Sequence, residues 1–266
     1  MKSGQGKPAH PQLKRKNQKM PEHSIITPEV ITRFDSVLAR GLCIGLGTSD
    51  GQMCIEAAVC YALNLPHGDN PSCVTPAIRI YKIHLNDTNW SNPNARAEGL
   101  RDLGIAQMGS NGVVSNSQFV VKLTKAIIRD LLPTLFREIF PDNERCLRAA
   151  KDCEFRGTLE TARVTARAAA RVAEATAEIA WTDDTVRAAK AAARVADAAA
   201  WAAESATWPT NTARAARAAA SAVAWAARAT TDTAEADPDK YLRLGANLAL
   251  QALQELDSPG CAYLNC

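Results

Sequence analysis

The stretch RAAKAAARVADAAAW, residues 187–201, decides the fold class of this 266-residue chain. Alanine, arginine and lysine are good helix formers because they lose little side-chain freedom in a helix. Charged and aromatic side chains recur here every three or four residues, so they share one face and alanine occupies the other. The stretch therefore predicts an amphipathic helix whose alanine face packs closely against neighbouring helices.

Similar segments lie on both sides of this stretch. RAAAR at 167–171, KAAAR at 190–194 and RAAAS at 217–221 repeat at spacings of 23 and 27 residues. Capping residues interrupt the pattern at 182–184 and 209–211, and such short connections predict antiparallel neighbours. A fourth helix, at 237–256, carries larger leucines and is expected to close the array as a cap.

The N-terminal half predicts helices through different signals. Thr-Pro or Asn-Pro pairs place a proline at the first helical position at Pro28, Pro76 and Pro93. The segment 78–85 has some strand-like alternation, but the preceding cap favours a helix. Pro133 is expected to kink or restart a helix that begins near Ser115.

These patterns predict an all-α protein with a helical N-terminal domain followed by an Ala-rich antiparallel helix array. The tail at 1–23 contains six lysine or arginine residues against one glutamate and is expected to be disordered. We predict a mixed-composition helical domain at 24–141, an Ala-rich helical repeat domain at 142–257 and a C-terminal tail at 258–266.

Composition bears on whether the protein enters a membrane and in which compartment it is located. No stretch approaches the roughly 18 uninterrupted apolar residues of a spanning helix, so we expect no membrane insertion. Eight cysteines lie mostly in helical patterns and no apolar leader follows the basic tail. Reduced thiols and a cytoplasmic location are therefore expected.

A cluster of cysteines and acids is the first candidate site. Cys54 lies in the first turn of a predicted helix, where the helix dipole favours a thiolate, and His67 or His84 could serve as its base. Cys54, His67, Asp69 and Cys73 could instead bind zinc, although their spacing matches no standard short-loop site. The simpler interpretation is that the cysteines are small buried hydrophobes.

Basic side chains on the Ala-rich helices are the second candidate site. Their simplest role is to solvate the outer helix faces. They could also bind an acidic protein, or a nucleic-acid backbone together with the basic tail, although no base-reading motif accompanies them. The candidate binding residues are Arg163, Arg167, Arg171, Arg187, Lys190, Arg194, Arg214 and Arg217.

Three short motifs resemble a group of uncharacterised bacterial proteins. They are DGQMCIEA at 50–57, DNPSCVTP at 69–76 and LND at 85–87. The resemblance covers about residues 41–110 and implies no particular reaction. Asn70 stands where that group often has histidine, which puts a metal ligand there in doubt. The positions that the resemblance marks are Cys54, Glu56, Asp69, Cys73, Asn86 and Asp87.

A second resemblance concerns the segment LPTLFREIFP at 132–141 and the Ala/Arg/Trp-rich helices after it. This part of the chain is similar to a helical immunity-protein family of bacterial toxin systems, which implies a binding role. We therefore expect a non-catalytic interaction or scaffold protein that binds a protein partner, such as an acidic one, or self-associates. The alternatives are a Cys54-centred metal or thiol enzyme, with zinc as the metal, and a nucleic-acid-binding protein.

Overall fold

A computed structural model describes residues 26–178, 183–230, 237 and 239–265. Within these ranges the secondary structure is helical, with two isolated β-bridges and no sheet, so the predicted all-α class is confirmed. None of the described helices is long and apolar enough to cross a membrane. The predicted basic tail at 1–23 lies outside the described residues.

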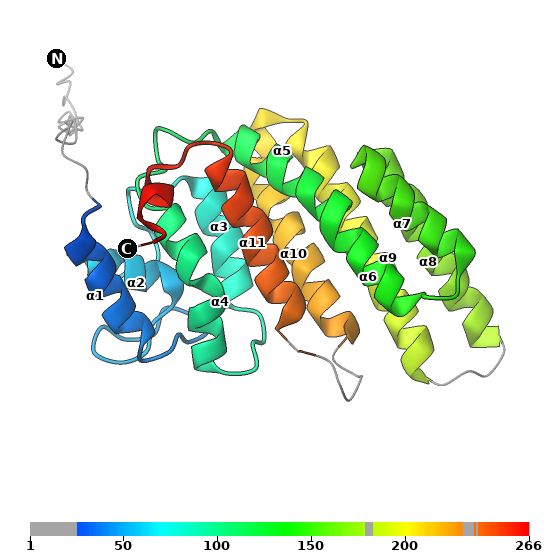
Figure 1. The fold of residues 1–266 in the computed structure, drawn as a ribbon, viewed down its shortest axis with the longest axis horizontal. Coiled ribbons are helices and arrows are strands. Elements are labelled where there is room, and N and C mark those ends of the chain that lie inside the picture. The colour runs from blue at the N-terminus through cyan, green and yellow to red at the C-terminus, as the bar shows by residue number, and fades with distance from the viewer. Residues whose placement is uncertain (1–25, 179–182, 231–236, 238, 266) are drawn as a thin grey trace, which may run out of the picture.

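The longest connections between the helices are the loops at 39–54 and 63–75, on either side of α2. Figure 1 places α1 and α2 at one end of the molecule and α7 and α8 at the other. Their bounds are α1 Pro28–Leu38, α2 Ile55–Ala62, α3 Pro76–Asn86, α4 Pro93–Ala106, α5 Asn116–Ala126, the π-helical turn η1 Ile127–Leu131, α6 Leu132–Ile139, α7 Glu144–Arg156, α8 Leu159–Glu178, α9 Asp183–Ala206, the 3-10 turn η2 Pro209–Asn211, α10 Thr212–Thr230, α11 Lys240–Gln254 and the 3-10 helix η3 Pro259–Tyr263.

The predicted helix starts are confirmed, with one difference in capping. Thr27 accepts a hydrogen bond from the Val30 N–H at the start of α1, and Asn92 caps α4 in the same way. Thr75 precedes α3 but makes no side-chain cap. Its hydroxyl donates instead to the carbonyl of Ser110 at 2.9 Å, which ties the start of α3 to the loop after α4.

The break predicted at Pro133 takes the form of a π-helical turn. Proline has no N–H, so the carbonyl of Arg129 loses its usual partner four residues later. The N–H of Leu132 bonds to the carbonyl of Ile127, five residues back, which is the π-helical pattern. The helix therefore continues past the proline with one extra residue in its turn.

The Ala-rich helices pack as predicted through their alanine faces. Ala192 on α9 and Ala219 on α10 are fully buried. Arg163 on α8 reaches Glu204 on α9, and Arg214 on α10 lies over Trp201 on α9. Each pair joins the start of one helix to the later part of its neighbour, so the predicted antiparallel order is observed.

The array does not stand apart from the N-terminal helices. α10 packs against α3, and α11 packs against both α4 and α10, as Figure 1 shows. The Tyr81 hydroxyl donates to the carbonyl of Gly245, which joins α3 to α11. The expected cap helix, α11, thus lies between the array and α4, and buried side chains form one continuous core across residue 142.

The end of the chain packs on α4. Ser258 donates to the carbonyl of Ala106 at 2.5 Å, and Gly260 lies against the same turn. A Cβ on Gly260 would lie 2.0 Å from the carbonyl oxygen of Ile105, so the contact requires glycine. The region predicted as a C-terminal tail therefore includes a short packed helix, η3.

Candidate functional site

The acid cluster predicted around Glu56 has a buried ionic centre. The Lys82 Nζ atom on α3 lies 3.4 Å from Glu56 Oε1 on α2, and both side chains are fully buried. Gln107, which follows α4, donates from Nε2 to the other carboxylate oxygen at 2.9 Å. The three side chains thus join α2, α3 and the end of α4.

Sequence reasoning singled out Glu56 but missed Lys82 and Gln107. The signal for Lys82 was present, because this lysine lies on the apolar stripe of α3 between Ile78 and Leu85. A lysine on a buried face needs a buried partner of opposite charge. Burial raises the pKa of Glu56 and lowers that of Lys82, while their mutual attraction opposes both changes. The closed geometry suits positioning of helices rather than contact with a substrate.

Cys54 is placed differently from a reactive thiol. It is the N-cap of α2, where its Sγ atom accepts a hydrogen bond from the Ala57 N–H at 3.4 Å. Its side chain is buried, and this burial raises the pKa of the Cys54 thiol to about 11 although the backbone N–H groups lower it. The start of a helix favours the thiolate form of Cys54, but burial disfavours it more strongly.

The four residues considered for zinc are not brought together. Cys54 and Cys73 are buried, whereas His67 and Asp69 are exposed on the loop after α2. The His67 Nε2 atom lies 3.3 Å from the carbonyl oxygen of Gly47. In the part of the chain that the structure describes, no group of three or more histidine, cysteine or acidic side chains could hold a metal ion.

Asn86 and Asp87 bind the loop that precedes α2, which contains Gly45, Gly47 and Gly51 and which we call the glycine-rich loop. The Asn86 side chain accepts from the Ile55 N–H at 3.3 Å and donates to the Cys43 carbonyl at 2.9 Å. Asp87 accepts from the Gly45 N–H at 3.0 Å. These contacts fix the loop and the start of α2 against the end of α3, which is a structural role.

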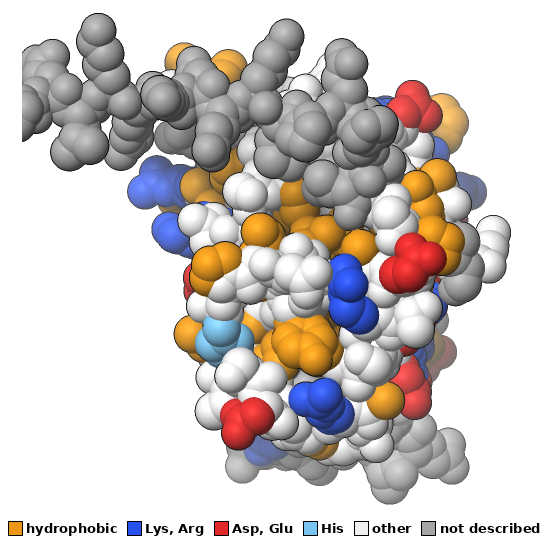
Figure 2. Space-filling view, turned by 90° about the vertical axis from the view of Figure 1, so that its left-hand side faces the viewer, with side chains coloured by type: hydrophobic (Ala, Val, Ile, Leu, Met, Phe, Trp, Pro, Cys, Tyr) orange, Lys and Arg blue, Asp and Glu red, His pale blue; other side chains and the backbone are white. Residues whose placement is uncertain are grey.

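The end of the molecule built from α1 to α4 has mixed surface chemistry. Figure 2 shows separate basic and acidic side chains there, among hydrophobic ones, on the part that described residues cover. Ile44 and Leu46 on the glycine-rich loop and Tyr61 on α2 are exposed. The described residues form no large patch of one charge in this view.

The arginine stripes predicted on the array are exposed and linked across helices. The Arg163 guanidinium pairs with Glu204 at 2.9 Å, which joins α8 to α9. The Arg194 guanidinium lies 4.7 Å from the ring centre of Trp225, and that of Arg214 lies 5.1 Å from Trp201. These contacts make the stripes of α8, α9 and α10 one surface.

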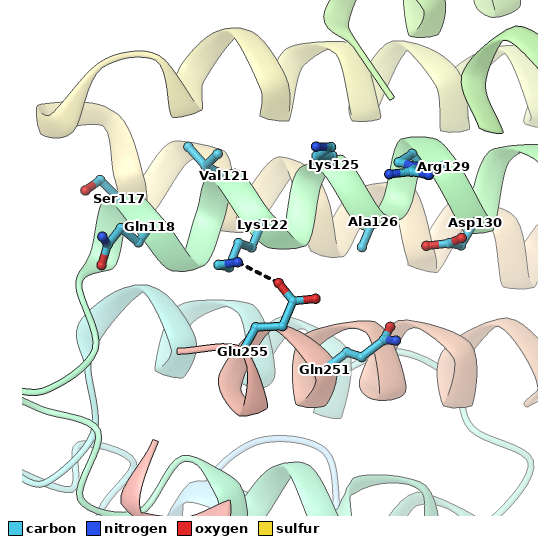
Figure 3. A pocket seen from close by; sticks show the side chains of 10 residues that line it. All are labelled: Ser117, Gln118, Val121, Lys122, Lys125, Ala126, Arg129, Asp130, Gln251 and Glu255. Carbon is cyan, nitrogen blue, oxygen red and sulfur yellow. Dashed lines mark hydrogen bonds and ion pairs between the residues drawn. The ribbon is translucent and has the colours of Figure 1, made fainter. Parts of the chain in front are cut away.

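Basic side chains of the described residues line a larger and a smaller groove. The larger, of about 690 Å³, lies between α5–η1 and α11 (Figure 3). The ion pair between Lys122 and Glu255, at 2.6 Å, crosses it, and Asp130 adds a second carboxylate. Its positive charge is therefore largely offset by acids of the chain itself.

The smaller groove, of about 340 Å³, lies between α7 and α8 and is more basic. We call it the arginine groove. Sequence reasoning missed its α7 side, because the arginines there lie outside the alanine repeats. It is lined by Arg145, Arg148, Ala149, Asp152, Val164, Arg167, Ala168 and Arg171.

Comparisons of this chain with protein-family models, with curated proteins and with solved structures found no match. The contacts described above therefore carry the argument about function.

Proposed function

We propose that the protein is a non-catalytic helical binding protein whose array recognises an acidic protein partner. The binding surface is the outer side of α8, α9 and α10, which we call the basic face. The basic face consists of Arg163, Arg167, Arg171, Arg187, Lys190, Arg194, Arg214, Arg217 and Arg228.

The stacking of arginine on tryptophan is the observation that carries this proposal. Arg194 and Arg228 both lie over the ring of Trp225, and Arg214 lies over Trp201. An indole holds the flat guanidinium in place and leaves its edge N–H groups for hydrogen bonds. Such arginines lose less side-chain freedom when they bind a carboxylate, which favours association.

The acids on this side of the array leave the basic face positively charged. Glu204 and Glu160 are each engaged by an arginine of α8. Asp197 on α9 and Glu174 on α8 are exposed acids on the same side, so the nine basic side chains still outnumber the four acids among the described residues. Neither Arg194 nor Arg214 pairs with a carboxylate of the described residues. A partner that supplies acidic side chains would neutralise the positive charge of these arginines.

Binding to polyglutamate, followed by fluorescence anisotropy at low and physiological salt, tests the proposal. A charge-reversed variant, Lys190→Glu with Arg217→Glu, should bind more weakly, because both positions are exposed on the basic face. Arg40→Glu with Lys125→Glu is the matched control, since it changes the net charge equally at exposed positions of α1's end and α5.

Three outcomes of this experiment can be told apart. Weaker binding by the basic-face variant than by the control supports recognition of an acidic protein. Equal loss in both variants would mean that only net charge matters, and the proposal would fail. Tighter binding to a single-stranded oligothymidine than to polyglutamate at the same salt concentration would replace the acidic protein with nucleic acid.

A further inference from the structure

Resting on the proposed function, we propose that the arginine groove is the docking site for one short acidic segment of the protein partner, and that this segment carries an apolar anchor side chain. The groove adjoins the basic face and shares Arg167 and Arg171 with it.

The two walls of the groove have the same spacing. Arg145, Arg148 and Asp152 follow one stripe of α7, and the residues from α8 repeat at the same helical intervals. Gly157, in the left-handed conformation at φ +60°, ends α7 and allows α8 to begin two residues later. The two helices therefore form a tight antiparallel hairpin.

The register of this hairpin gathers the arginines at one end. The Thr165 hydroxyl donates to the Ala149 carbonyl at 3.4 Å, which fixes the two helices relative to each other. In this register Arg148 lies at the level of Arg167, and Arg145 and Arg171 lie near each other farther from the turn. Asp152 and Val164 occupy the end nearer the turn.

The chain neutralises these arginines only weakly. Arg148 pairs with Glu144 at 4.0 Å and Arg167 with Glu160 at 3.5 Å. Both pairs are largely exposed, so water screens them. Arg145 and Arg171 make no ion pair with a carboxylate of the described residues. The groove therefore keeps positive charge and guanidinium donors that suit carboxylates.

Apolar groups lie at the other end of the groove. Val164 lines this end and is 41% exposed. Phe155, three residues beyond Asp152 on α7, lies outside the lining residues and is 84% exposed. Ala149 and Ala168 are small buried residues that line the groove between its arginines. An apolar side chain of the partner would cover this end.

The shape and charge favour a protein segment over a nucleic acid. A groove of about 340 Å³ is near the small end of ligand sites and holds a few side chains, not a whole helix. Asp152 would repel a phosphate backbone, whereas it can accept hydrogen bonds from peptide N–H groups. A segment with acidic residues at one end and an apolar residue at the other would match the arginine end and the Val164 end of the groove.

Labelled 12-residue synthetic peptides test this assignment by fluorescence anisotropy. One peptide carries four glutamates followed by leucine, and its matched partner has serine in place of leucine. The groove variant is Arg145→Glu with Arg171→Glu, and Phe155→Ser probes the apolar end. Lys190→Glu with Arg217→Glu is the control, because it makes the same charge change on the basic face outside the groove.

We expect the groove variant to bind the leucine peptide about tenfold more weakly than the control variant does. Phe155→Ser should weaken binding of the leucine peptide and leave the serine peptide unaffected. If charge reversal lowers the helix content seen by circular dichroism, Arg145→Gln with Arg171→Gln repeats the test without adding negative charge.

Other results would overturn the assignment and show which proposal fails. If the groove variant and the control lose affinity equally, the groove is not the docking site. The basic face then stands only if both variants lose more affinity than Arg40→Glu with Lys125→Glu does. If oligothymidine competes for the groove better than the leucine peptide does, the ligand is not a protein segment. If neither peptide nor polyglutamate binds at low salt, the proposed function also fails.

Discussion

The ammonium group of Lys82 lies 3.4 Å from the carboxylate of Glu56, and neither side chain is exposed to solvent. This pair lies where α2, α3 and the end of α4 meet. The packing of these three helices therefore depends on each buried charge being balanced by the other. Neither Glu56 Oε1 nor Lys82 Nζ makes a geometrically good hydrogen bond, although the two atoms are in ion-pair contact. The centre is therefore sensitive to the loss of either partner.

Replacing Lys82 with methionine should destabilise the protein by about 3–5 kcal/mol, because it leaves the Glu56 carboxylate buried without a counter-charge. Urea unfolding at pH 7 measures the change. The double variant Glu56→Leu with Lys82→Met should recover most of that loss, since it removes both charges. A double variant as unstable as the single one would mean that the cost comes from packing.

The instability of Lys82→Met should shrink as the pH falls. Burial raises the pKa of Glu56, and removal of Lys82 takes away the charge that opposes this rise. A carboxyl whose folded pKa is above its unfolded value stabilises the fold when protonated, so stability increases as the pH falls through the folded pKa. Urea unfolding between pH 7 and pH 5 should show that the difference in unfolding free energy between Lys82→Met and the unmodified protein becomes smaller. For Glu56→Gln with Lys82→Met, this difference should not change with pH.

Cys54 and Cys60 should react slowly with iodoacetamide in the native protein at pH 7.5. Burial raises the pKa of both thiols to about 11, so little thiolate is present. Cys43 and Cys261 are more accessible and should be labelled first. Mass spectrometry of digested samples gives the order, and rapid selective labelling of Cys54 would revive the thiol-enzyme hypothesis.

Ala192→Leu should lower the melting temperature, because Ala192 is fully buried in the close contacts of α9. Added methylene groups in a packed core cost about 1–3 kcal/mol. Ala175→Leu is the matched control, since Ala175 is an exposed position on α8. Thermal unfolding followed by circular dichroism should give a lower melting temperature for Ala192→Leu than for Ala175→Leu. Equal melting temperatures would mean that the structure around Ala192 can relax to fit the larger side chain.

Local signals predicted the fold well. Thr27 and Asn92 act as the expected caps, and Ala192 faces inward, because capping and helical periodicity depend on residues only a few positions apart. The closeness of α10 to α3 could not be predicted in this way. It depends on which alanine face meets the apolar side of α3, and the alanine faces of α8, α9 and α10 are nearly alike in sequence.

The candidate sites were less predictable for the same physical reason. Glu56 was identified, but its partners Lys82 and Gln107 come from other helices or their ends. Arg145 and Arg148 gain significance only when the α7–α8 hairpin brings Arg167 and Arg171 beside them. Such sites are formed by tertiary contacts, and no short-range pattern in one chain specifies those contacts.

The π-helical turn at Ile127–Leu131 gives the rod from α5 to α6 two differently aimed faces. One added residue turns the later side chains by about 100° around the helix axis. α5 thus packs against α9, α10 and α11, while α6 packs against α7 and α9. One continuous helix therefore contacts the centre of the molecule with one face and the α7–α8 hairpin with another, and the buried leucines of α6 are shifted by one residue relative to those of α5.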